Sequence, residues 1–273
     1  MFARLISTKD PDFLYDVPDV LYKYRDINNE NHKNLLFKRE LYFSSISQFN
    51  DPFDGTIPYR FNSEQLTPDN IFLKYREILK YYHPDWNEEM VHQECFDIQS
   101  SGLMHDSKHL EKVERDVLDL LDKQFGIVCL CKNKSNFLLW SHYANCHTGF
   151  AIGFDKKKLF NDTQAHFAHM QYQEELPVLR LFEDVEAHFE KLIGTKSKIW
   201  QYEEEYRLSK IGMAGKTVEL QKETIVEVIF GCKMPHEKKV HLIEFLKNEY
   251  PHIRTYDTTL SKTHFKLEFL QLL

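Results

Sequence analysis

The spacing of apolar and polar residues changes character along the chain. Near the start, alternating and aromatic-rich runs predict short strands at 19–25 and 41–46, with a helix at 29–40 between them. From about 64 to 124 the apolar residues recur at spacings of three and four, which predicts an insert made of several helices. Strand patterns return directly after this insert.

The second half mixes strands and helices without regular alternation. A short helix or turn is expected at 137–149, and helices are expected at 181–194 and 236–250. Further strands are predicted at 125–133, 149–155, 171–180, 198–210, 224–235, 252–257 and 264–272. Strict βα alternation is absent, so the pattern favours an α+β fold over a doubly wound parallel sheet. We interpret residues 1–273 as one α+β domain with the helical insert at about 64–124.

The segment 198–210, KIWQYEEEYRLSK, places charged residues where a half-buried strand is expected. Alternate side chains of a strand share a face, so Glu203, Glu205 and Arg207 are predicted to lie together, with the two glutamates repelling each other. Such charges are costly on a buried face unless they have a function, whereas a solvated helix face would carry them without comment. We expect Arg207 to restrain the two carboxylates.

Three other motifs have both structural and functional interpretations. WSHY at 140–143 is either a packed aromatic corner or a stacking surface for a base or nicotinamide, and the sequence leaves these two open. FNDPFDG at 49–55 has the residues of a turn, and structure alone is the favoured explanation. YKYR at 22–25 sets Lys23 and Arg25 on one strand face, which is usual for an exposed edge.

Composition narrows the class of protein. Hydrophobic residues make up 42% of the 273 residues, enough for a large core, and the net charge of −7 argues against a general electrostatic grip on nucleic acid. Five cysteines without paired spacing, no leader-like start and no long apolar run favour a cytoplasmic protein that does not cross a membrane. Walker, Rossmann and zinc CxxC motifs are missing from the sequence, so we expect no metal.

Four stretches together resemble a known family. In chain order they are LYKYR, LYFSSISQFNDPFDG, LLWSHYANCHTGFAIGFD and WQYEEEYRL. Their residues and order resemble the bacterial family catalogued as domain of unknown function 2971, with FNDPFD and W..YE.EYR as the specific elements. The helical insert is the part least similar to that family.

A more distant resemblance concerns the order of the strands. An early strand ending in a basic residue, a helix, a LYFS strand and a late E-x-E strand resemble the ADP-ribosyltransferase fold, a split, mostly antiparallel sheet that clamps NAD. The resemblance implies that Arg25 matches the early basic residue and Glu205 the late glutamate. For the central position of that fold, Ser44, Ser45 and Tyr143 all compete.

The resemblance implies an NAD-dependent ADP-ribosyltransferase-like enzyme, a toxin or phage-defence effector that modifies a nucleic acid or a protein. Glu205 would stabilise the positive charge that develops on the ribose, and Glu203 would orient or deprotonate the acceptor. The implied NAD-binding residues are Arg25, Tyr24, Ser44, Asn50, Trp140, His142 and Tyr143. Two other classes stay open: a nucleic-acid-processing enzyme (a nuclease or an RNA phosphotransferase) that uses His142, and a non-catalytic ligand sensor or interaction protein.

Overall fold

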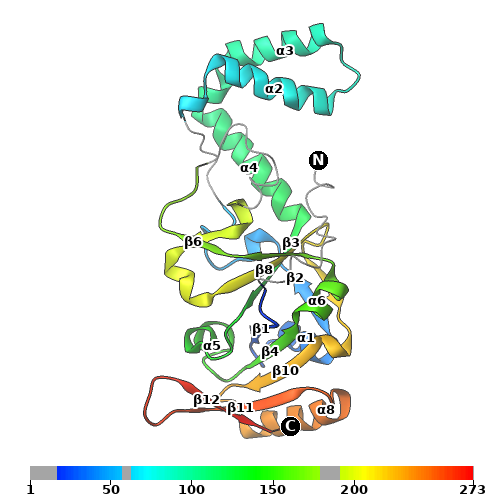
Figure 1. The fold of residues 1–273 in the computed structure, drawn as a ribbon, viewed down its shortest axis with the longest axis vertical. Coiled ribbons are helices and arrows are strands. Elements are labelled where there is room, and N and C mark those ends of the chain that lie inside the picture. Colours follow the sequence, from blue (N-terminus) through cyan, green and yellow to red (C-terminus); the bar gives the residue numbers. More distant parts are fainter. Residues whose placement is uncertain (1–16, 57–62, 179–190, 273) are drawn as a thin grey trace.

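The computed structural model describes residues 17–56, 63–178 and 191–272, and Figure 1 shows a large sheet with a helical arm at one end. In the order in which they lie side by side, the sheet strands are β12 (Leu267–Gln271), β11 (Arg254–Leu260), β10 (Ile225–Phe230), β4 (Phe150–Asp155), β1 (Val20–Arg25), β3 (Phe125–Cys131), β8 (Glu205–Ile211) and β5 (His166–His169). Neighbouring strands are antiparallel except β10 and β11, which are parallel. The predicted α+β fold with a mostly antiparallel sheet is therefore confirmed.

The sheet splits between β1 and β3. Strand β1 pairs with β4 over six residues on one side, but it pairs with β3 only at Tyr22 and Cys131. Beyond that pair, residues 23–25 and 129–130 line a common pocket. Strand β1 is therefore central, and the expectation that YKYR forms an exposed edge is wrong because β4 and β3, both far along the chain, cover its two sides.

Two small pairs of strands flank the sheet. Strand β2 (Glu40–Phe43) pairs antiparallel with β9 (Lys216–Glu219), which lies far along the chain. A bridge between Ser44 and Ile127 joins this pair of strands to β3. Strand β6 (Gln171–Gln173) pairs in parallel with β7 (Thr195–Ser197). The structure describes residues 171–178 of the strand predicted at 171–180, and of these only the first three pair in a ladder.

Four further helices pack around the sheet. They are α1 (Glu30–Phe37), α5 (Phe137–Tyr143), α6 (Lys156–Thr163) and α8 (His236–Glu249). The side chain of Asn29 caps α1, and Asn136 caps α5 by accepting from the N–H groups of Leu138 and Leu139. The main core contains residues from both halves of the sheet and also from α1 and β2. Its members without measurable exposure include Leu21, Leu36, Phe43, Phe150, Phe154, Leu208, Val228 and Phe230.

The predicted insert consists of α2 (Pro68–Tyr82), α3 (Glu88–Ser101) and α4 (Ser107–Gln124). Figure 1 shows that α2 and α3 lie beyond the far end of α4, away from the sheet. Only the end of α4 reaches the core, where Leu121 packs with Phe125 and Ile46. Among the three helices of the insert, the end of α4 alone therefore packs beside the sheet, because α4 runs directly into β3. None of the helices in the described ranges has both the length and the apolar character needed to span a membrane.

The strand predicted at 198–210 begins late. Residues Lys198–Glu203 form a 3₁₀ helix, η6, and Glu204 has a left-handed backbone with φ 46° before β8 begins at Glu205. The predicted helix at 181–194 lies mostly outside the described residues, which include only its helical end at 191–194.

Candidate functional site

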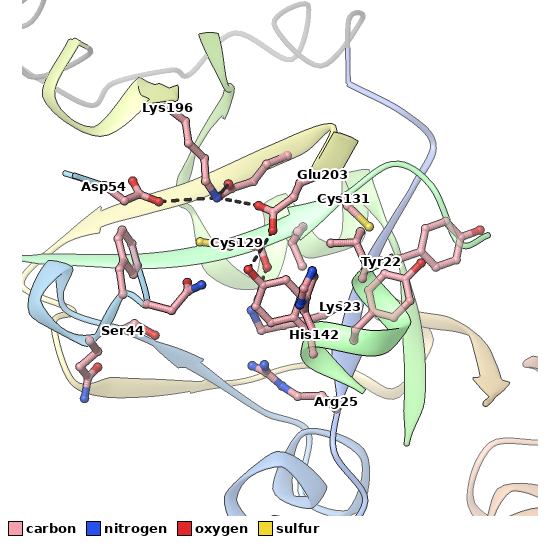
Figure 2. Close-up of a pocket in the computed structure, with 18 residues that line it drawn as sticks. Tyr22, Lys23, Arg25, Ser44, Asp54, Cys129, Cys131, His142, Lys196 and Glu203 are labelled. Atoms are coloured by element: carbon pink, nitrogen blue, oxygen red, sulfur yellow. Dashed lines mark hydrogen bonds and ion pairs between the residues drawn. The ribbon is translucent and has the colours of Figure 1, made fainter. Parts of the chain in front are cut away.

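A pocket of about 510 Å³ lies in the split of the sheet, within the size range of small-molecule sites. It draws residues from β1, β3, α5, β7 and the turn after β2, so segments far apart in the sequence meet there (Figure 2). Its lining residues are Tyr22, Lys23, Tyr24, Arg25, Ser44, Gln48, Phe49, Asn50, Asp54, Cys129, Leu130, Cys131, Leu139, His142, Tyr143, Lys196, Glu203 and Glu205.

One wall of the pocket carries a buried ionic network centred on Lys196. The Lys196 Nζ lies 2.6 Å from Glu203 Oε2 and 2.7 Å from Glu205 Oε2, and 3.6 Å from Asp54 Oδ2 (Figure 2). Arg207 contacts Glu205 through Nε at 2.6 Å and Asp54 through Nη2 at 2.6 Å. All five side chains are at most 7% exposed, so each depends on its partners for compensation.

The network changes the titration of its members. Burial alone raises the pKa of Glu205, but Arg207 and Lys196 outweigh burial and lower it to about 2. Burial lowers the pKa of Lys196, yet Glu205, Glu203 and Asp54 together raise it well above its usual range. Three carboxylates against two cations leave the network with one net negative charge at neutral pH. The expected repulsion between Glu203 and Glu205 is thus relieved by the ammonium between them.

The two glutamates have different surroundings. Both oxygens of Glu205 receive hydrogen bonds from cations, whereas Glu203 Oε1 accepts from the neutral hydroxyl of Tyr143 at 2.8 Å. Burial, followed by the charge of Glu203, raises the pKa of Tyr143, which therefore stays a donor. Because Glu205 is already neutralised by two cations, Glu203 is the better placed of the pair to act on a positive charge in a ligand.

Local backbone features position these acids. The left-handed turn at Glu204 directs that side chain outward to Lys132, 2.6 Å away, while its neighbours Glu203 and Glu205 both face the pocket. The side-chain amide of Asn136 donates to the carbonyl of Tyr202 and so ties α5 to η6. The predicted grouping of Glu203, Glu205 and Arg207 is found, although Glu203 lies on a 3₁₀ helix and not on the strand.

The opposite wall carries two basic side chains from β1, Lys23 and Arg25 (Figure 2). The guanidinium of Arg25 has no hydrogen bond or ion pair within the described part of the chain, and burial lowers its pKa to about 10, so it stays charged. The Lys23 Nζ donates to the carbonyl of Cys129 at 2.8 Å. Burial, and then the charge of Arg25, lower the pKa of Lys23 to about 7. The pocket is thus acidic on one wall and basic on the other.

Most predicted site residues do line this pocket. Those that line it are Tyr24, Arg25, Ser44, Asn50, His142, Tyr143, Glu203 and Glu205. Trp140 does not, because it is fully buried, donates from Nε1 to the carbonyl of Lys134 at 3.0 Å, and packs edge-on to Tyr24. The two interpretations of WSHY therefore apply to different residues. Trp140 packs in the aromatic corner, whereas His142 and Tyr143 at the end of α5 line the pocket.

Among the three candidates for the central position, Ser44 fits best. It lines the pocket, and no hydrogen bond to its hydroxyl occurs within the described residues. The hydroxyl of Ser45 pairs with that of Ser47, and Ser45 does not line the pocket. Tyr143 uses its hydroxyl on Glu203.

Sequence reasoning missed Asp54 and Lys196, and it placed Lys23 on an exposed edge. Asp54 belongs to FNDPFDG, and the turn propensity of this motif was a sufficient explanation for its aspartates, so the buried carboxylate was not recognised. Lys196 stands in a short polar strand without any local signal. The thiol-bearing residues Cys129 and Cys131 also line the pocket. Burial raises the pKa of both to about 12, and across the described ranges no group of three or more His, Cys, Asp or Glu residues could hold a metal ion.

Comparison with known proteins gives one match. The model of the family described as "Protein of unknown function (DUF2971)" matches residues 139–208, which confirms the resemblance to that family over this segment. The matched segment includes the acidic wall with Lys196, Glu203 and Glu205, while the cationic wall from β1 lies outside it. No curated protein and no solved structure matches the chain significantly.

Proposed function

We propose that this protein is an ADP-ribosyltransferase-like enzyme that binds NAD in the split of its sheet. The observation that carries the proposal is the juxtaposition, in one pocket, of the unpaired Arg25 and the carboxylate of Glu203. A ligand that suits both walls combines an anionic group with a centre that becomes positively charged. NAD meets both demands, because it carries a pyrophosphate and its ribose gains positive charge as nicotinamide leaves.

The chemistry follows from the acidic wall. Nicotinamide leaves the ribose C1′ with the bonding electron pair, and an acceptor oxygen or nitrogen forms the new bond to C1′ and loses its proton. The transition state resembles the oxocarbenium ion of glycoside chemistry. Glu203 would stabilise this charge, since its Oε1 faces only a neutral hydroxyl, and Glu205 would hold Lys196 and Arg207 in place. This assignment gives Glu203 the role that the resemblance implied for Glu205, and it gives Glu205 a structural role.

The cationic wall supports binding of the pyrophosphate. A guanidinium forms paired, charge-assisted hydrogen bonds with two phosphate oxygens, and Arg25 has no competing partner within the described residues. The hydroxyl of Ser44 and the amide of Asn50 line the same pocket and offer neutral hydrogen bonds to the ribose or the carboxamide. Tyr24 contributes its ring edge, since its hydroxyl donates to the carbonyl of Asn133 at 2.7 Å.

Aromatic rings beside the pocket support a macromolecular acceptor. His142, Trp200 and Tyr202 have ring centroids between 6.0 and 6.5 Å apart, and His142 is exposed. Rings of this kind stack on bases or pack against a peptide. His142 lacks a hydrogen bond to any carboxylate in the described ranges, so the geometry favours an acceptor-contacting role over the acid–base role of a nuclease.

The proposal is tested by NAD binding and nicotinamide release. At 100 times Kd, NAD should stabilise the fold by about 2.7 kcal/mol, which raises Tm by roughly 5–10 °C. Arg25→Ala should abolish most of this shift, and Glu203→Gln should retain binding but lower nicotinamide release by about 10²–10³. The control is Arg76→Ala, which removes an exposed arginine paired with Glu88 on the helical insert.

The outcomes separate the function classes. Binding without nicotinamide release, with or without a nucleic acid or protein acceptor, would identify a ligand sensor and refute the transferase. An unchanged melting curve at millimolar NAD, together with no nicotinamide release, would refute both. Equal loss of the NAD shift in Arg25→Ala and Arg76→Ala would show that the pocket is not where NAD binds.

A further inference from the structure

Lys23 is an ionisable pocket residue for which neither ion pairing nor the proposed NAD chemistry gives a role. Its Nζ has a single hydrogen-bond partner within the described residues, the carbonyl oxygen of Cys129 on the far side of the split. A neutral amine can donate to a carbonyl acceptor, so this contact does not require an ammonium. The carboxylates of the pocket are held by Lys196 and Arg207, and none of them lies within ion-pair distance of Lys23.

The surroundings of Lys23 favour its uncharged form. Strand residues two apart share a face and lie roughly 6.6 Å apart, so the guanidinium of Arg25 stands beside the amine on the same wall. The ionisable groups that face Lys23 from β1, β3, β8 and α1 are Arg25, Cys129, Cys131, Glu205 and His32. Burial lowers the pKa of His32 to about 4 and keeps the two thiols protonated, so among these groups only Glu205 favours the ammonium, and two other cations already neutralise it.

We propose that Lys23 is a nucleophilic amine that forms a reversible imine with a phosphate-bearing aldehyde or ketone, while Arg25 holds the phosphate. The lone pair of Nζ attacks the carbonyl carbon, the carbonyl oxygen takes up protons and leaves as water, and nitrogen loses its two protons as the C=N bond forms. No oxidant or reductant takes part. A few bonds between carbonyl and phosphate match the separation of the two side chains along the strand.

The electrostatic setting supplies the reactivity. At pH 7 and a pKa of about 7, half of the Lys23 amines are uncharged, against about one in 3,000 for a lysine at the usual 10.5. Buried lysines beside another cation are the usual imine-forming lysines of enzymes. Lys196 lines the same pocket and provides an internal contrast, because two carboxylates at 2.6 and 2.7 Å keep it charged.

The inference does not depend on NAD cleavage, because it requires only the pocket and the two side chains of β1. The open-chain form of ADP-ribose, which NAD cleavage would release by hydrolysis, is one member of the proposed ligand class. A failure of the NAD experiments would therefore leave the imine standing, and the imine experiment can fail while NAD still binds.

The test is reductive trapping of the full-length protein with pyridoxal 5′-phosphate and borohydride at pH 7, followed by peptide mapping. We expect Lys23 to be labelled at least ten-fold faster than any exposed lysine and Lys196 to stay unlabelled. Pyridoxal, which lacks the phosphate, should label Lys23 at least ten-fold less, and Arg25→Ala should remove that difference. Lys23→Met, checked by its melting curve, should abolish the fast phase of labelling.

Three results would overturn the proposal. The first is labelling that is spread over surface lysines without a fast site. This result can be read from the peptide map of the wild type alone. The second is labelling of Lys196 at the rate of Lys23, which would mean that pocket access and not the amine determines reactivity. The third is equal labelling by pyridoxal and its phosphate, which would refute the anchoring by Arg25.

Discussion

Replacing Glu205 by Gln tests whether the ionic network holds the fold together. Gln keeps the shape of the side chain but removes the negative charge that faces Arg207 at 2.6 Å and Lys196 at 2.7 Å. Two buried cations then share only Glu203 and Asp54. The charge count of the network then balances, but each cation has lost a carboxylate that it contacts directly, so we expect this variant to be clearly less stable than the wild type.

Two independent routes give a similar magnitude. A pKa lowered from 4.5 to about 2 corresponds to roughly 3 kcal/mol in favour of the ionised carboxylate in the folded protein. Removal of one partner from a buried ion pair typically costs about 3–5 kcal/mol. For a chain of this size, such a loss lowers Tm by roughly 6–20 °C.

The assay is thermal unfolding of the wild type, Glu205→Gln and a control, Glu219→Gln, as a function of pH. Glu219 pairs with Arg39 at the surface and is 67% exposed, so its loss should cost at most about 1 kcal/mol. The pKa of Glu205 is depressed by folding, so its stabilisation is complete above pH 4.5 and is lost as the pH falls toward 2. The difference between wild type and Glu205→Gln should therefore be constant near neutrality and shrink below pH 4.5.

Equal melting temperatures for Glu205→Gln and Glu219→Gln at pH 7 would refute this reasoning. So would a difference that persists unchanged at pH 2.5, because a carboxyl with a pKa of 4.5 in the unfolded chain and about 2 in the folded protein contributes little stability at that pH. Either result would mean that Lys196 and Arg207 find other compensation on folding.

Four further predictions concern other parts of the molecule. Tyr143→Phe leaves Oε1 of Glu203 without its donor, so thermal unfolding should show a loss of about 1–3 kcal/mol; an unchanged Tm would contradict this. At pH 7, iodoacetamide should modify the exposed Cys146 first and reach Cys129 only after denaturation, since burial raises the pKa of the Cys129 thiol to about 12; mass spectrometry of modified peptides decides. Chelation should leave nicotinamide release unchanged, and a loss restored by added zinc would show a metal requirement. Alanine at the exposed charges of α2 and α3 should leave turnover within a few-fold, whereas a larger fall would assign the helical arm to the site.

The sequence pattern predicted where strands and helices occur better than it predicted which strands pair with each other. Runs such as 125–131 and 225–230 are apolar and β-branched, so local chemistry is enough to identify them as strands. The central position of β1 depends on its pairing with β4, more than a hundred residues away, and YKYR carries no mark of that pairing. The segment 198–203 looks extended by composition, but hydrogen bonding to α5 and the left-handed Glu204 make it a 3₁₀ helix.

The site was predictable where its chemistry is local. Glu205 and Arg207 are two positions apart on β8, so their contact followed from spacing alone, and Glu203 joins them through the ammonium of Lys196. Asp54 reaches Arg207 across 153 positions, and a single sequence contains no signal for such a contact. Lys196 is only nine positions from Glu205, but the turn that brings its ammonium back between the glutamates has no pattern that sequence reasoning could use.

The ionic network also limits how the protein can evolve. A single substitution among its five members removes a directly contacting charged partner from at least one other buried member, whereas simultaneous replacement of a whole ion pair by apolar residues can be nearly neutral. Evolutionary paths through these positions therefore pass through unstable intermediates unless changes arrive together. Across related genes, positions 54, 196, 203, 205 and 207 should accordingly vary together. Their exchanges should preserve the summed charge of the network, and sequences with only one of the five positions changed should be rare.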